Sequence, residues 1–179
     1  MSHVGVGRCQ LVWAVTEISV ASARDAGAIA ALRGHVARDM TRRYGEGHWS
    51  ACPSVADVRR QVRASHVLVA RQGEDIVGTV RLVAARQWAI DSGAFTPART
   101  ALYVFGLAVA SEARGLGIGR EIMEAAKAKA REWPAQALWL DAYDHAAGAG
   151  GFYLACGFRK VGPSSRSEVP VIFYEWLVD

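Results

Sequence analysis

The sequence predicts one domain of the α/β class, of the α+β kind, in which helices cover a mixed sheet. The chain has 179 residues, the usual size of a domain with a single core. Apolar residues make up 51% and charged residues 21%, a balance typical of globular proteins rather than disordered ones. Segments of helical period alternate with β-branched runs in the order β-αα-βββ-α-β-α-ββ. Without repeats or a linker, residues 1–179 should form one domain, with the first ten or so as a loose tail.

The N-terminal elements are predicted from period and capping residues. A first strand should run from about Val12 to Val20. Ser22, with Asp25 three residues later, predicts a capped helix, and apolar residues at helical spacing follow. Ser54 and Asp57 repeat the same signal ahead of a second, basic helix.

The remaining elements follow the same logic. The turn at 72–75 predicts a hairpin between two β-branched runs. Pro134 should end a long amphipathic helix. Tryptophans on periodic elements, Trp133, Trp139 and Trp176, are predicted to lie in the core. The predicted elements are the hairpin at 66–85, a strand at 101–110, a helix at 118–133, a strand at 138–140, a short helix at 148–155 and a strand at 169–177.

Composition excludes several classes of protein. No segment reaches the roughly 18 uncharged apolar residues that a membrane span needs, and the apolar patch Leu11–Val15 is shorter than the core of a signal peptide. Cys9, Cys52 and Cys156 form no CxxC pair, and the histidines show no metal-binding spacing. We therefore expect a cytoplasmic protein without a metal site or a disulfide framework.

A glycine-rich turn carries the clearest chemical signal. The strand 102–110 leads into Gly115, Gly117 and Gly119, and a helix begins directly behind them. Such a turn directs free backbone N–H groups and the positive end of the helix dipole at one point, which suits a phosphate or pyrophosphate. Arg120 stands where a P-loop has lysine and where a Rossmann fingerprint has its third glycine, so neither of those nucleotide sites is favoured.

Two motifs lie about forty residues apart in the second half of the chain. Arg114–Gly119 has the pattern Q/R-x-x-G-x-G/A, and Tyr153–Phe158 has the pattern Y-x-x-x-G-F. They resemble the pyrophosphate motif and the second motif of the GNAT superfamily of acyl-CoA N-acyltransferases. The resemblance covers residues 102–162 and implies a mostly antiparallel mixed sheet with helices on both faces. It also implies an enzyme that moves an acetyl group from acetyl-CoA to an amine by direct attack.

The resemblance assigns roles to individual residues. Backbone groups of 107–109 should pair with the pantetheine arm, and the amides of 114–120 should hold the pyrophosphate. Tyr153 matches the tyrosine that protonates the departing CoA thiolate as a general acid. The implied cofactor-binding residues are Leu107, Ala108, Val109, Arg114, Gly115, Leu116, Gly117, Ile118, Gly119, Arg120 and Tyr153.

The chain departs from the family pattern at two positions, and the general base stays open. Ala146 stands where the second motif often has asparagine, and Tyr103 stands where some members keep a carboxylate base. A water chain could replace a base. Candidate bases lie just ahead of the tyrosine helix and in loops that could fold over the site, namely Asp141, Asp144, His145, Glu46, His48 and Asp91.

The acceptor is expected to be a small-molecule amine. Tyr103, Trp88 and Tyr143 are predicted to line its pocket, while Tyr44, Trp49 and Phe95 could serve either the pocket or packing. Alternatives are an amine on a protein or on aminoacyl-tRNA, and a non-catalytic acyl-CoA-binding module. No membrane partner is expected, and nucleic acid enters only through the tRNA alternative. The strand 169–178 could form a homodimer or complete the sheet.

Overall fold

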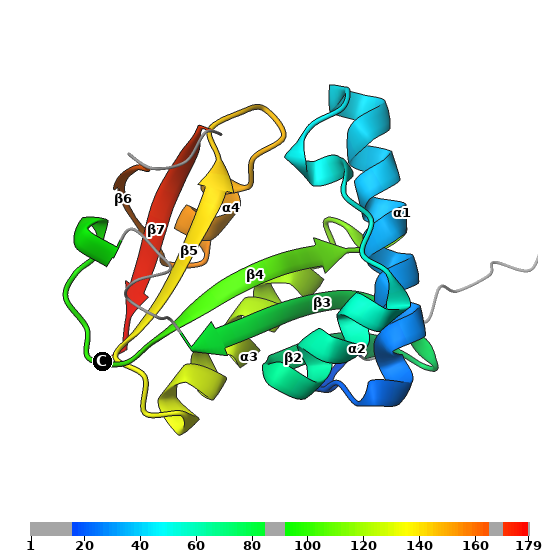
Figure 1. Ribbon diagram of the computed structural model, residues 1–179, viewed down its shortest axis with the longest axis horizontal. Coiled ribbons are helices and arrows are strands. Elements are labelled where there is room, and N and C mark those ends of the chain that lie inside the picture. The colour runs from blue at the N-terminus through cyan, green and yellow to red at the C-terminus, as the bar shows by residue number, and fades with distance from the viewer. Residues whose placement is uncertain (1–15, 85–91, 165–169, 179) are drawn as a thin grey trace, which may run out of the picture.

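A computed structural model describes residues 16–84, 92–164 and 170–178 (Figure 1). The start of the first predicted strand, Trp88 and Asp91 lie outside these residues. The order of helices and strands is the predicted one. They are β1 (Thr16–Val20), α1 (Ala26–Tyr44), α2 (Val55–Ala64), β2 (His66–Gln72), β3 (Asp75–Ala84), β4 (Ala101–Val109), α3 (Ile118–Glu132), β5 (Ala137–Tyr143), α4 (Gly150–Ala155), β6 (Arg159–Pro163) and β7 (Val171–Leu177).

The strands form one mixed sheet that opens near its middle. Its order is β1-β2-β3-β4-β5-β7-β6, and the β4–β5 pair is the parallel one. These two strands pair only where Ala101–Tyr103 faces Ala137–Trp139, and they then spread apart (Figure 1). The second half of β4 therefore turns backbone groups toward an opening instead of a neighbouring strand.

A bulge in β4 lies beside this opening. Phe105 pairs with Arg81 of β3, and Ala108 pairs with Thr79, so two residues of β4 stand opposite one of β3. Gly106 is one of the two and has φ +57°, a conformation that residues with a side chain rarely adopt.

Helices cover both faces of the sheet, as expected. On one face, α1 and α2 bury Ile29 and Val58 against Val67 and Val69 of β2. On the other, α3 buries Ile122 and other side chains in the main core with Leu102, Leu138 and Leu140. In Figure 1, α3 and α4 lie behind the sheet, and α1 and α2 lie in front.

The capping signals are confirmed. Ser22 and Asp25 form a reciprocal capping box, which opens a short 3-10 turn at Ala23–Asp25 directly before α1. Ser54 and Asp57 form the equivalent box at α2. No helix within the described ranges is long and apolar enough to cross a membrane.

Two local predictions are corrected. Helix α4 begins at Gly150 rather than at 148, because the amide of Gly148 closes a turn on the carbonyl of His145. Trp133 is 43% exposed and its core assignment is wrong, because it caps the C-terminus of α3 outside the helical conformation and packs edge-on against His66. Trp139 is buried as predicted, and Trp176 is half-buried beneath Lys127 and Arg131.

Candidate active site

A cavity of about 830 Å³ occupies the opening between β4 and β5. Its volume lies in the range of small-molecule and cofactor sites. Of the predicted cofactor-binding residues, Leu116 is exposed and does not line the cavity. The others all do: Leu107, Ala108, Val109, Arg114, Gly115, Gly117, Ile118, Gly119, Arg120 and Tyr153.

The glycine turn forms a cradle suited to an anion. Gly115 and Gly117 have φ +80° and +86°, and Gly117 caps α3 without a side-chain hydrogen bond. The first amides of α3 have no acceptor within the helix, so they remain available at the cavity. A Cβ on Gly119 would lie 3.2 Å from the ring of Phe152, which shows how closely α3 packs on α4. The residues present therefore fit a pyrophosphate.

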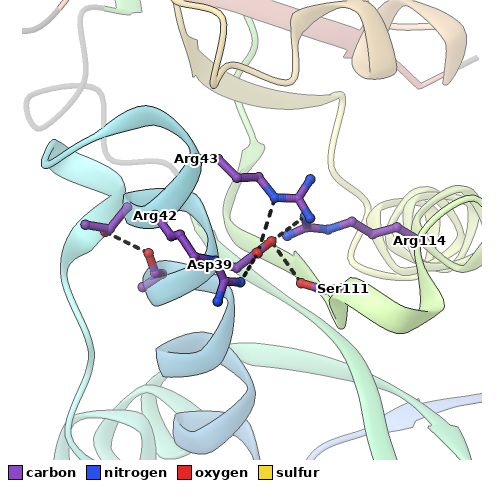
Figure 2. A network of polar contacts seen from close by, with 7 residues as sticks. Asp39, Arg42, Arg43, Ser111 and Arg114 are labelled. Carbon is purple, nitrogen blue, oxygen red and sulfur yellow. Dashed lines mark hydrogen bonds and ion pairs between the residues drawn. The ribbon is translucent and has the colours of Figure 1, made fainter.

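Asp39 ties helix α1 to this turn (Figure 2). It is 3% exposed, and its Oδ2 accepts hydrogen bonds from Ser111 Oγ at 3.0 Å and Arg114 Nη1 at 2.9 Å. Its Oδ1 accepts from Arg42 at 2.6 Å and Arg43 at 3.2 Å. The hydrogen bond from Arg42 is the largest of the contacts that hold the pKa of Asp39 well below its usual range.

The sequence analysis did not identify Asp39 as a partner of the predicted cofactor-binding residue Arg114. The structure shows that the Arg114 guanidinium already pairs with the Asp39 carboxylate. The available signal was weak, since Asp39 is simply an acid within the basic stretch 38–43 of a helix.

Tyr153 lies at the cavity, with its ring packed among Phe152, Phe158 and Tyr174. Burial raises the pKa of its hydroxyl, and the negative charge of Asp141 adds to the effect. The phenol therefore keeps its proton at neutral pH.

Among the candidate bases in the described residues, Asp141 is the one that lines the cavity. It accepts a hydrogen bond of 2.6 Å from the hydroxyl of Tyr103. Burial is the largest cause of the raised pKa values of Tyr103, Tyr143 and Tyr153, and the negative charge of Asp141 is the second cause for each of them. The Asp141 carboxylate therefore lies near all three phenols.

The other candidates lie elsewhere. Asp144, Glu46 and His48 are exposed and do not line the cavity. His145 stacks on Trp49 at 5.2 Å, and its Nδ1 accepts a hydrogen bond from the amide of Ala147. That bond occupies the acceptor nitrogen of the neutral ring, which a base needs free.

The aromatic predictions divide between lining and packing. Tyr143 lines the cavity, and so does Trp49. Tyr103 is buried and does not line the cavity, but it contacts two residues that do, because its hydroxyl donates to Asp141 and its ring lies 4.7 Å from that of Phe105. Phe95 stacks on Trp139 at 4.6 Å in the core, which decides its role as packing. Arg33 and Phe105 line the cavity and were not predicted.

The family model of the acetyltransferase (GNAT) family matches residues 34–158, most of the chain and both of its motifs. The chain belongs to this family. This GNAT protein is accordingly an acyltransferase that uses acetyl-CoA, as the two motifs predicted. A sequence comparison with curated proteins finds no match.

Solved structures show the same fold at low sequence identity. An N-acetyltransferase from Staphylococcus aureus Mu50 is 16% identical, with a TM-score of 0.70 over 92% of this chain and 99% of that one. The putative acetyltransferase yncA from Salmonella typhimurium, solved with its cofactor acetyl-CoA, is 15% identical, with a TM-score of 0.71 over 92% and 95%. A ribosomal-protein-alanine N-acetyltransferase from Brucella melitensis is 19% identical, with a TM-score of 0.69 over 90% and 99%. The GNAT fold is confirmed.

Proposed function

We propose that this GNAT protein transfers the acetyl group of acetyl-CoA to the primary amine of a small molecule by direct attack. One observation carries the proposal. A single cavity at the β4–β5 opening is lined by the anion cradle of α3, by Tyr153 and by Asp141. An anion site, a proton donor and a carboxylate for an amine are the parts that acyl transfer to an amine needs.

Residues of the chain itself would bind the cofactor. The backbone of 107–109 faces the opening, and the amides at the start of α3 can receive the pyrophosphate. When bound, acetyl-CoA supplies the activated acetyl thioester and a thiolate leaving group. The amide near Val109 would meet the developing oxyanion.

Tyr153 and Asp141 would handle the protons. The Tyr153 hydroxyl keeps its proton because burial raises its pKa, and it would donate that proton to the thiolate sulfur. Asp141, held by the hydroxyl of Tyr103, would receive the amine's proton at its carboxylate.

The test of Tyr153 is the variant Tyr153→Phe, with Tyr174→Phe as the matched control. Both tyrosines are buried and their rings lie 6.1 Å apart, but Tyr174 does not line the cavity. Loss of the proton donor should lower kcat about 100-fold, with the Kd for CoA unchanged. Tyr174→Phe should keep kcat, as measured by thiol release. Unchanged turnover in Tyr153→Phe would remove the proposed role.

The same phenol sets an expectation for the pH profile. Because its pKa lies above the ordinary value of about 10, Tyr153 stays protonated through pH 9. A fall of kcat between pH 7 and 9 would therefore come from another group.

The acceptor class needs its own experiment, because one fold serves several acceptors. The structure named for ribosomal protein alanine and one named as an aminoglycoside 6'-acetyltransferase both resemble this chain. Thiol release should be measured with small amines, peptides and aminoacyl-tRNA side by side. Turnover confined to peptides or tRNA would replace the small-molecule proposal, and binding of CoA without turnover on any amine would favour a non-catalytic module.

A further inference from the structure

Arg33 of α1 has two buried hydrogen-bond donors and lines the cavity. Its Nη1 donates to Gln61 Oε1 of α2 at 2.7 Å. Its Nε and Nη2 are buried and have no hydrogen-bond partner within residues 16–84, 92–164 and 170–178, although Arg33 lines the cavity. A buried donor without an acceptor costs free energy, so a ligand that accepts hydrogen bonds from this pair would remove that cost.

The geometry of the guanidinium indicates what would satisfy it. Nε and Nη2 share one edge of the planar group, and their two N–H bonds run parallel. This edge matches the two oxygens of a carboxylate, which accept two hydrogen bonds at once. The remaining edge is already engaged through Nη1 and Gln61.

Positive charge is concentrated at the same place. Arg81 of β3 lies 5.0 Å from the ring of Phe105, another residue of the cavity wall. Burial is the largest cause that lowers the pKa of Arg33 to about 10, and the like charge of Arg81 is the second. Arg33 is still cationic at neutral pH, and an anion placed beside it would be attracted by both guanidinium groups.

The bulge of β4 places Gly106 directly against the Arg33 edge. A Cβ on Gly106 would lie 3.4 Å from Nη2, 3.5 Å from Cζ and 3.8 Å from Nε. No side chain stands there, because φ +57° favours glycine. Nε and Nη2 are shielded from solvent, so a ligand would reach them only if the Arg33 side chain turned toward the cavity that it lines.

We propose that the Nε–Nη2 edge of Arg33 binds a carboxylate of the acceptor, so that the acceptor is an amino acid or a related amine with an acidic group. This inference rests on the proposed transfer to a small-molecule amine and names the substrate class. Asp141 would receive the ammonium end of the same molecule, since both residues line the cavity.

The experiment compares amino acids with their carboxamides, which keep the carbon skeleton and lose the carboxylate. Thiol release is measured for the native enzyme, for Arg33→Met and for Arg38→Met. Arg38 is an exposed arginine of α1 that does not line the cavity, so it controls for the loss of one positive charge. For each variant, kcat/KM for the amino acid is divided by kcat/KM for the carboxamide. Comparing this ratio between variants removes the effect of the different amine pKa values of the two acceptors.

Arg33→Met should lower kcat/KM for the amino acid about 10- to 100-fold, the range expected for lost hydrogen bonds to a charged group. Activity on the carboxamide and the KM for acetyl-CoA should change little, and Arg38→Met should behave as the native enzyme. Arg33→Lys, which keeps the charge but lacks the paired donors, should restore only part of the loss. An equal loss on both acceptors, or a rise only in the KM for acetyl-CoA, would overturn the inference.

A binding measurement separates this inference from the proposed function. Calorimetry with CoA present measures the Kd of the amino acid and its carboxamide for the native protein and for Arg33→Met. Carboxylate-dependent binding that Arg33→Met abolishes, without turnover, would refute the proposed reaction and keep the anion subsite. Turnover of carboxamides with no preference for the carboxylate in either assay would keep the reaction and refute the subsite.

Discussion

At the scale of single residues, Asp39 shows how one buried carboxylate can hold the residues of a site in place although it does not itself line the cavity. Each of its oxygens accepts two hydrogen bonds, one pair from arginines of its own helix and one pair from Ser111 and Arg114 (Figure 2). The pair on Oδ1 comes from arginines of the same helix whose side chains are largely exposed, so it connects no other element to α1. The pair on Oδ2 joins α1 to the residues just before the cradle, so it should fix the position of the turn.

Asp39→Asn should weaken binding of CoA several-fold and leave kcat nearly unchanged. The amide would present a donor to Arg114 or Ser111 and loosen the turn. The Kd for CoA, measured by calorimetry, tests this. Arg42→Ala is the control, because it removes a contact of Oδ1 and leaves Oδ2 in place. An unchanged Kd in Asp39→Asn would mean that the turn holds its shape alone.

The same variant gives a pH prediction. The folded pKa of Asp39 lies below its unfolded value of about 3.9, so its charge stabilises the fold fully above that pH. The contribution is lost as pH falls through the folded pKa. The stability difference between native protein and Asp39→Asn should therefore be constant from pH 7 to 5 and shrink below about pH 4, as followed by urea unfolding. A difference that grows on acidification would contradict this assignment.

At the scale of elements, the turn between β4 and α3 depends on backbone conformation more than on side chains. Gly115 and Gly117 are both left-handed, and a Cβ on either would meet no atom within 4 Å. Strain, not crowding, is therefore what a side chain would bring there.

Gly117→Ala should destabilise the protein by about 1 kcal/mol and raise the Kd for CoA, because alanine disfavours φ +86°. Gly27→Ala is the matched control, since Gly27 lies in α1 with ordinary φ and open space around it. That change should be neutral or slightly stabilising. Urea midpoints and calorimetry measure both effects, and equal midpoints for the two variants would show that the turn relaxes without cost.

At the scale of the whole molecule, the sheet consists of two halves that are joined by three residue pairs between β4 and β5. One half contains β1 to β4, and the other contains β5, β7 and β6. The cavity is lined by residues of both, so a bound cofactor would contact each side of the opening. Ligand binding should consequently stabilise the entire fold.

Acetyl-CoA and CoA should each raise the melting temperature, while ATP and NAD should not. A ligand at about 100 times its Kd adds roughly 2.7 kcal/mol. For a domain of this size that corresponds to a rise of about 5 to 10 °C. Scanning fluorimetry with the four ligands in separate samples measures it, and an equal rise with ATP would indicate a general phosphate site instead.

Residues whose role depends on their near neighbours in the chain could be predicted from the sequence. The capping boxes of Ser22 and Ser54, the glycines of the cradle and the order of strands and helices all follow from spacings of a few residues. Tyr153, which lines the cavity, was singled out because its motif is also local. Trp133 was misplaced because a helical period does not mark the residue at which the helix stops.

The sequence by itself determined the family, the cofactor class and the turn that suits a pyrophosphate, because these depend on short motifs and backbone conformation. Only the tertiary structure decided that Asp39 holds Arg114, that the hydroxyl of Tyr103 holds Asp141, and that two buried donors of Arg33 lie beside Gly106 without a partner in the described part of the chain. Asp39 and Arg114 are 75 residues apart, and Tyr103 and Asp141 are 38 apart. Such contacts arise from packing between distant segments, and no local pattern of residue types encodes them.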